Sequence, residues 1–211
     1  MTENQTPFIW LTGMSGSGKS KLSSAVKQEL TEQGLTVCII GSDTVLESYQ
    51  QKLGFSRAEV MQNNLHITSL CQKVRSDFDV ILVLVISPFA FVRQKVRKLL
   101  APNFHLVYLK TDLNSLKARE PKGLYQTADD GIITNLIGYS KTTPYEQPDD
   151  ADLILDTGNQ FTAAESKVGI LGYIQILFFN TIFCFESVLM CFSVLKAYEY
   201  SVIPTVSFPV L

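Results

Sequence analysis

The chain has 211 residues, which is long enough for one well-buried α/β domain and short for two full domains. Its 18 basic and 20 acidic residues give a formal net charge of −2 without any basic run, which argues against generic binding to a nucleic-acid backbone. The four cysteines show neither a CxxC pair nor metal-ligand spacing, and no secretory signal is evident, so a reducing, cytoplasmic location is expected.

Apolar runs alternate with helical patterns along the first 160 residues. The runs that predict strands are 7–13, 35–43, 78–87, 104–110 and 151–158. The patterns that predict helices are 19–34, 57–76, 89–100 and 113–120, with a further helix starting near Thr162. Because strands and helices alternate, the sequence predicts an α/β fold in which helices cover both faces of a parallel sheet.

A phosphate-binding loop is predicted between the first strand and the first helix. Its residues fit the pattern G-x4-G-K-[ST]: Gly13, Met14, Ser15, Gly16, Ser17, Gly18, Lys19 and Ser20. Glycines let the backbone approach phosphates closely, and the following helix N-terminus adds a partial positive charge. Lys19 is expected to bridge the β- and γ-phosphates of ATP, and the Ser20 hydroxyl to ligate Mg²⁺. The sequence therefore predicts a P-loop NTPase fold.

A P-loop alone does not separate kinases from GTPases, motor ATPases or regulators. We find no N/T-K-x-D motif of the kind with which GTPases recognise the base. Residues 119–131, REPKGLYQTADDG, are typical of a mobile lid that closes over phosphates and excludes water. The size of the chain and this lid favour a small-molecule kinase.

Several segments, taken in order, resemble adenylylsulfate kinase. They are GMSGSGKS at 13–20, LGFS at 53–56, ISPF at 86–89, FHLVYLK at 104–110, REPKGLY at 119–125 and PYEQPDDADLILDTG at 144–158. The resemblance covers roughly residues 7–174, and KGLY followed by PYE is specific to this family. It implies transfer of the ATP γ-phosphate to the 3′-hydroxyl of adenosine 5′-phosphosulfate, in sulfate assimilation. The expected partner is this small nucleotide acceptor, with association into a homodimer left open.

The resemblance and the chemistry of the acceptor together predict the remaining site residues. A planar purine with an anionic tail needs aromatic faces and cationic or N–H donors. The residues expected to bind the acceptor are Phe55, Asn63, Phe89, Arg93, Lys122, Gly123 and Leu124. Asp43 is expected to position the metal or to accept the proton of the acceptor hydroxyl, and Arg119 to stabilise the transferred phosphoryl group.

Ser87 leaves the carboxyl end of the most apolar predicted strand, where ligands gather in open α/β sheets. The serine at this position of the family is described as an active-site serine or a phosphoserine intermediate, and the resemblance implies the same for Ser87. The alternative is that Ser87 caps the following helix, and the two roles are compatible.

The acceptor half of the site departs from the family pattern. Gly41 replaces an aspartate, Leu136 replaces a purine-stacking phenylalanine, and three positions lack the usual arginine: Leu46, Val60 and Leu65. An arginine paired with an anion contributes about 1.5–3 kcal/mol per charged hydrogen bond. The losses therefore predict weak binding of a phosphosulfate unless other groups, such as Arg57 and His66, compensate in part.

Two functional hypotheses remain. The first is an active kinase whose acceptor is adenylylsulfate or a different, less anionic nucleotide or alcohol. The second is a degenerate module that binds ATP without kinase activity and acts as a regulator or partner subunit. The intact P-loop, Ser87, Arg93 and KGLY favour the kinase, because a chain freed from catalysis has little physical reason to keep them in register.

The carboxyl-terminal part of the chain has a different composition. Residues 168–195 are nearly all apolar, with Glu186 as the single charged residue. Three interpretations compete: a membrane anchor, a helix integrated in the domain, and an accidental extension without selected structure. We expect a P-loop kinase domain over residues 1–174 and a hydrophobic extension over 175–211, with membrane contact through 168–195 left open.

Overall fold

The computed structural model describes residues 6–41, 56–120, 123–158 and 162–182. The predicted strands all lie in one parallel sheet: β1 (Phe8–Thr12), β2 (Val37–Gly41), β3 (Val80–Leu84), β4 (Phe104–Lys110) and β5 (Leu153–Asp156). The strand order is β2-β3-β1-β4-β5, so the strand that leads into the P-loop is the central one. The predicted parallel sheet is confirmed.

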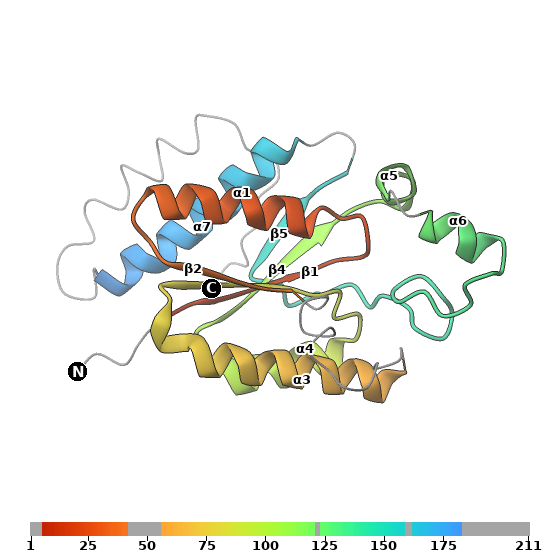
Figure 1. Ribbon diagram of the computed structural model, residues 1–211, viewed down its shortest axis with the longest axis horizontal. Helices are drawn as coiled ribbons and strands as arrows, with labels where there is room; N and C mark the ends of the chain where they lie inside the picture. Colours follow the sequence, from red (N-terminus) through yellow and green to blue (C-terminus); the bar gives the residue numbers. More distant parts are fainter. Residues whose placement is uncertain (1–5, 42–55, 121–122, 159–161, 183–211) are drawn as a thin grey trace.

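Helices cover both faces of this sheet, as predicted (Figure 1). One face carries α1 (Lys19–Glu32) and α7 (Ala163–Ile182), and the other carries α3 (Arg57–Val74) and α4 (Ala90–Leu100). A short 3-10 turn, Arg75–Asp77, follows α3. Two short helices, α5 (Leu113–Arg119) and α6 (Leu124–Asp129), lie beyond the edge of the sheet that carries the P-loop. Of these, α6 falls in the segment that the sequence assigns to the lid.

The central strand β1 is buried on both faces. Phe8 and Trp10 pack in the apolar cluster beneath α3 and α4, whereas Ile9 and Leu11 pack in the cluster beneath α1 and α7. Successive side chains of a strand point to opposite faces, so a strand covered on both sides needs apolar residues at consecutive positions. This is why the run Phe8–Leu11 is apolar throughout. The strand leads directly into the P-loop.

The start of α3 is determined by a capping box. The Ser56 side chain accepts a hydrogen bond from the N–H of Glu59, and the Glu59 carboxylate accepts one from the N–H of Ser56 at 3.0 Å. Helix α3 begins at Arg57, and the first turn of this helix lies at the edge of the sheet where the strands end (Figure 1).

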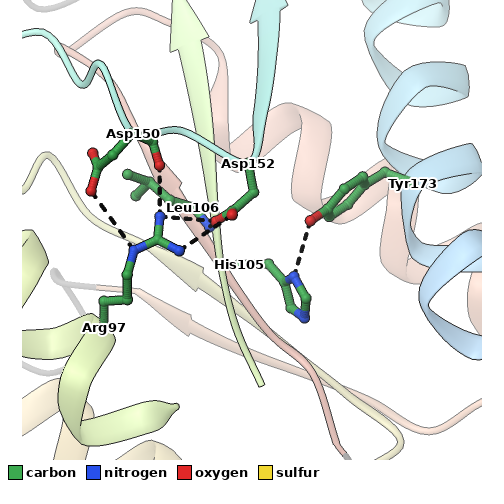
Figure 2. A network of polar contacts seen from close by, with 6 residues as sticks. All are labelled: Arg97, His105, Leu106, Asp150, Asp152 and Tyr173. Carbon is green, nitrogen blue, oxygen red and sulfur yellow. Dashed lines mark hydrogen bonds and ion pairs between the residues drawn. The ribbon is translucent and has the colours of Figure 1, made fainter. Parts of the chain in front are cut away.

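A polar network holds the amino ends of β4 and β5 together, at the edge opposite the P-loop (Figure 2). The Asp152 carboxylate accepts the N–H of Leu106 at 2.6 Å and pairs with Arg97 at 3.0 Å. At the preceding residue of β4, His105 Nδ1 lies 3.0 Å from the hydroxyl of Tyr173, a residue of α7. These contacts join α4, β4, the segment before β5 and α7.

Helix α7 continues without interruption past residue 174, where the sequence predicts the domain to end. Ile170 and Ile174 are fully buried in the cluster beneath α1, and Leu177 and Phe178 pack against the same cluster. The helix ends at Ile182. Within the residues that the structure describes, no helix has the length and apolar character needed to cross a membrane. The rest of the predicted extension, from residue 183 on, lies outside the described residues.

Candidate active site

The P-loop curls between β1 and α1 and depends on glycine at several positions. Gly13, Gly16 and Gly18 have φ angles of 154°, 80° and 94°. A Cβ atom on Gly13 would lie 2.8 Å from Ser17 Oγ and 2.9 Å from the Leu109 carbonyl oxygen, so only glycine lets the loop approach β4 this closely. The predicted loop therefore has the tight backbone that a phosphate cradle requires.

Lys19 lies with its ammonium inside the curl of the loop. Its Nζ donates to the carbonyl oxygens of Gly13 at 2.7 Å and Met14 at 2.9 Å, and to Ser17 Oγ at 3.3 Å. A phosphate oxygen is a stronger acceptor for an ammonium than these neutral groups. Ser20 follows in the first turn of α1 and is exposed. Since Mg²⁺ uses few protein ligands together with water and substrate phosphates, an exposed hydroxyl beside the cradle fits this ion.

The lid contacts the P-loop through Tyr125 of α6. This residue is 2% exposed, and its hydroxyl donates to the Ser15 carbonyl oxygen at 2.7 Å. Its ring packs edge-on against Tyr139, with the ring centres 5.1 Å apart. Burial raises the pKa of Tyr125 to about 12, so the hydroxyl keeps its proton and remains a donor. No pattern in the sequence predicts a role for this residue, although Tyr125 is the sole aromatic residue in REPKGLYQTADDG.

The first residue of the predicted lid, Arg119, is bonded to the loop that follows β5. The guanidinium of Arg119 donates to the carbonyl oxygens of Thr157 and Gly158, the latter at 2.8 Å, just after β5. Gly123 precedes α6 in the left-handed conformation, with φ 64°, and Leu124 is the first residue of that helix. The structure therefore ties Arg119 to the loop after β5, and its contact with a transferred phosphoryl group stays a prediction.

Ser87 lies in a strained and buried position after β3. It is 1% exposed, and its φ angle of 44° is uncommon for a residue other than glycine. Its Oγ atom has no hydrogen-bond partner among the described residues. The following helix begins after Phe89 without a side-chain cap, so the alternative in which Ser87 caps that helix is wrong. Strain together with a buried, unpartnered hydroxyl is typical of a functional position.

Arg93 is buried behind Ser87 rather than open to an acceptor. It is 1% exposed, and it donates to the carbonyl oxygens of Ser87 at 2.8 Å and Glu146 at 2.7 Å. The Tyr145 ring centre lies 5.8 Å from the guanidinium carbon. Both terminal nitrogens of Arg93 thus bind backbone carbonyls and position the Ser87 loop. Its Nε atom has no hydrogen-bond partner among the described residues, and a contact between Arg93 and the acceptor stays a prediction.

The PYE motif is a brace for that loop. The N–H of Glu146 donates to the Pro88 carbonyl oxygen at 2.8 Å, and the Glu146 carboxylate accepts the N–H of Ala90 at 2.7 Å. The Tyr145 hydroxyl lies 2.9 Å from Thr12 Oγ1, at the end of β1. The motif thus joins the central strand to the loop after β3 and to the start of α4.

The predicted acceptor-binding residues divide into several groups. Three expected site residues lie outside the described part of the chain: Asp43, Phe55 and Lys122. Asn63 is half-buried on α3, and its Oδ1 atom is buried without a hydrogen-bond partner among the described residues, as expected of a ligand-binding amide. Phe89 is fully buried, and the guanidinium carbon of Arg57 lies 4.6 Å from its ring centre.

The positions that lack the family arginines also differ from one another. Val60 is 6% exposed and belongs to the core cluster beneath α3 and α4. Leu65 is half-buried on the same helix, and Leu46 lies outside the described residues. At Val60, therefore, an arginine of the family pattern has been replaced by a residue of the hydrophobic core.

The sequence is similar to known kinases that carry a P-loop. Residues 5–156 match the family model for adenylylsulphate kinase. The adenylyl-sulfate kinase of Bacillus pumilus is 38% identical over 173 residues, which cover 82% of this chain and 86% of that protein. The probable adenylyl-sulfate kinase of Bacillus subtilis is 37% identical over 157 residues, covering 74% of this chain and 79% of that protein.

Solved structures give the same result. The Mycobacterium tuberculosis APS kinase, in complex with AMPPNP and APS, is 29% identical with a TM-score of 0.73, covering 81% of this chain and 98% of that one. A gluconokinase from Sinorhizobium meliloti shares the fold, at 15% identity and a TM-score of 0.56, over 85% of this chain and 98% of that one. This chain belongs to the adenylylsulfate kinase family.

Proposed function

We propose that this chain transfers the γ-phosphate of ATP to the 3′-hydroxyl of adenosine 5′-phosphosulfate. The observation that carries the proposal is the family match over residues 5–156, together with relatives named adenylyl-sulfate kinase at 37–38% identity. The site geometry supports it, because the P-loop, the strained Ser87 loop and the PYE brace all lie where the parallel strands end.

The P-loop and Lys19 hold the triphosphate. On binding, the β- and γ-phosphates replace the Gly13 and Met14 carbonyl oxygens as acceptors for the Lys19 ammonium. The exposed Ser20 hydroxyl would help to hold Mg²⁺, which would supply positive charge to the phosphate oxygens when bound. Phosphoryl transfer is mostly positioning and charge stabilisation, so these groups contribute directly to the rate.

The acceptor side is organised by the loop after β3. Arg93 and Glu146 hold the backbone around Ser87, which places its hydroxyl at the carboxyl edge of the sheet. Asp43 accepts the proton of the acceptor hydroxyl as the phosphoryl group is transferred. The lid closes on the P-loop side through Tyr125 and keeps water from competing with the acceptor.

We place this reaction in the cytoplasm, where ATP and Mg²⁺ are available. The proposal is supported by the two cysteines in the described part of the chain, Cys38 and Cys71, which are free thiols. Association into a homodimer is part of the same proposal, and light scattering of the purified chain tests it.

An ATP-consumption assay tests the proposed reaction. The purified chain should consume ATP when adenosine 5′-phosphosulfate is present, and only slowly with AMP, which lacks the sulfate. Lys19→Ala should abolish this turnover, because the ammonium that would bridge the β- and γ-phosphates is removed, and the variant should keep the wild-type circular dichroism spectrum. If ATP binds in calorimetry but no acceptor is phosphorylated, the degenerate ATP-binding module is the correct hypothesis.

A further inference from the structure

We propose that Arg57 binds the phosphosulfate tail of the acceptor and thereby replaces the arginines that this chain lacks. The inference rests on the proposed function, since it assigns a ligand to the acceptor half of the same site. Arg57 is the first residue of α3, and its side chain is 57% exposed. Its guanidinium carbon lies 4.6 Å from the centre of the Phe89 ring, and its NH2 atom lies 3.3 Å from Glu146 Oε1.

These two contacts place the guanidinium beside the Ser87 loop. Phe89 follows Ser87 by two residues, and Glu146 bonds to the Pro88 carbonyl oxygen between them. A guanidinium over an aromatic ring is held near that ring by a cation–π contact, and its N–H groups can still donate to an anion. That geometry suits bidentate binding of a phosphate or sulfate group.

The ion pair with Glu146 does not prevent Arg57 from taking a ligand. The pair is partly exposed, and such pairs contribute little to stability. Glu146 uses its other oxygen, Oε2, to accept the N–H of Ala90 at 2.7 Å. The carboxylate therefore keeps a hydrogen-bond partner when the guanidinium turns from Oε1 to an anion.

The neighbouring basic residues are less suited to this task. Both terminal nitrogens of Arg93 already donate hydrogen bonds to the carbonyl oxygens of Ser87 and Glu146. His66 lies nine residues after Arg57 on the same helix, a spacing that places the two side chains about half a turn apart, on opposite faces. Of the two residues that the sequence offered as compensation, the structure therefore favours Arg57.

Isothermal titration of the full chain with adenosine 5′-phosphosulfate and with adenosine tests the inference, because the two ligands share the nucleoside and differ in the anionic tail. Arg57→Gln should weaken binding of the phosphosulfate at least about tenfold, the effect of losing one charge-assisted hydrogen bond. Binding of adenosine should change by less than about threefold. Arg57→Lys should give an intermediate loss, since lysine keeps the charge without the fork.

Arg75→Gln is the matched control. Arg75 also lies over an aromatic ring, 5.7 Å from the centre of Phe8, but at the other end of α3. This variant should bind both ligands as the wild type does. The inference is overturned if the wild type binds the phosphosulfate no more tightly than adenosine, or if Arg57→Gln weakens both ligands equally.

Turnover measured in parallel separates this inference from the proposed function. If Arg57→Gln keeps the wild-type KM for adenosine 5′-phosphosulfate, the assignment of Arg57 fails and the kinase reaction stands. If phosphosulfate binding depends on Arg57 but the wild type phosphorylates none of it, the kinase reaction fails and the binding role of Arg57 stands.

Discussion

The hydroxyl of Tyr125 in the lid donates a hydrogen bond to the carbonyl oxygen of Ser15 in the P-loop, at 2.7 Å. This hydrogen bond fixes the orientation of the peptide plane that contains the Ser15 carbonyl group. The neighbouring N–H groups of the loop are then preorganised for phosphate. Tyr125 thus connects lid position to the shape of the phosphate cradle.

Tyr125→Phe should raise the KM for ATP about fivefold, because it removes one neutral hydrogen bond while keeping the buried ring. Steady-state kinetics with ATP as the varied substrate measure this change. The control is Tyr139→Phe, whose hydroxyl bonds to Asp129 inside the lid at 2.6 Å. Equal effects of the two variants on KM would contradict a specific role for the bond to Ser15.

Arg93→Gln should lower the free energy of unfolding by about 2–3 kcal/mol, since it leaves the carbonyl oxygens of Ser87 and Glu146 without their donors. Urea denaturation measures the loss. Lys95→Gln, at an exposed position of the same helix, should change stability by less than about 0.5 kcal/mol. A fully stable Arg93→Gln chain that has lost only acceptor affinity would contradict this structural role and support Arg93 as a ligand-binding residue.

Much of the fold could be predicted from the sequence because its strands are buried on both faces. Such strands appear as uninterrupted apolar runs, and the predicted run 104–110 coincides with β4. Helix α6 was not predicted, because six residues are too few to show a helical repeat. The P-loop is equally visible, since its chemistry depends on residues that are consecutive in the chain.

The acceptor side could not be predicted to the same depth, because its geometry depends on contacts distant in sequence. Arg93 and Glu146 are 53 residues apart, and no local pattern shows that a buried arginine binds that carbonyl oxygen. The left-handed backbone of Ser87 is likewise a tertiary effect, since serine has no intrinsic preference for positive φ. The exposed arginine beside Phe89 becomes meaningful only when α3 and α4 are seen together.

His105 should make the protein less stable below neutral pH. Burial lowers the pKa of His105 in the folded chain, an effect that the nearby Asp152 opposes and Arg97 reinforces. Below about pH 6.5 the unfolded chain therefore binds more protons than the folded one. The free energy of unfolding decreases as the pH is lowered, until the pH passes the lower pKa that His105 has in the folded chain. His105→Gln should show a smaller fall in Tm between pH 8 and pH 5.5. Parallel Tm curves for the two proteins would contradict this assignment.

The extent of α7 predicts where the chain can be shortened. A chain ending at residue 182 should fold and bind ATP, because it keeps every described residue of α7. A chain ending at residue 174 lacks Leu177 and Phe178, which are partly buried against the core cluster, and should lose about 2 kcal/mol of unfolding free energy. That loss corresponds to a fall in Tm of about 4–8 °C for a domain of this size.

Urea midpoints and ATP-dependent thermal shifts compare these two chains with the full-length protein. The full-length chain carries the apolar residues 183–211 and should aggregate or partition into detergent, whereas the chain ending at 182 should not. Equal stability of the two shortened chains would place the end of the domain at residue 174, as the sequence predicts. Unfolding of the chain ending at 182, beside a stable and monomeric full-length protein, would show instead that residues 183–211 complete the core.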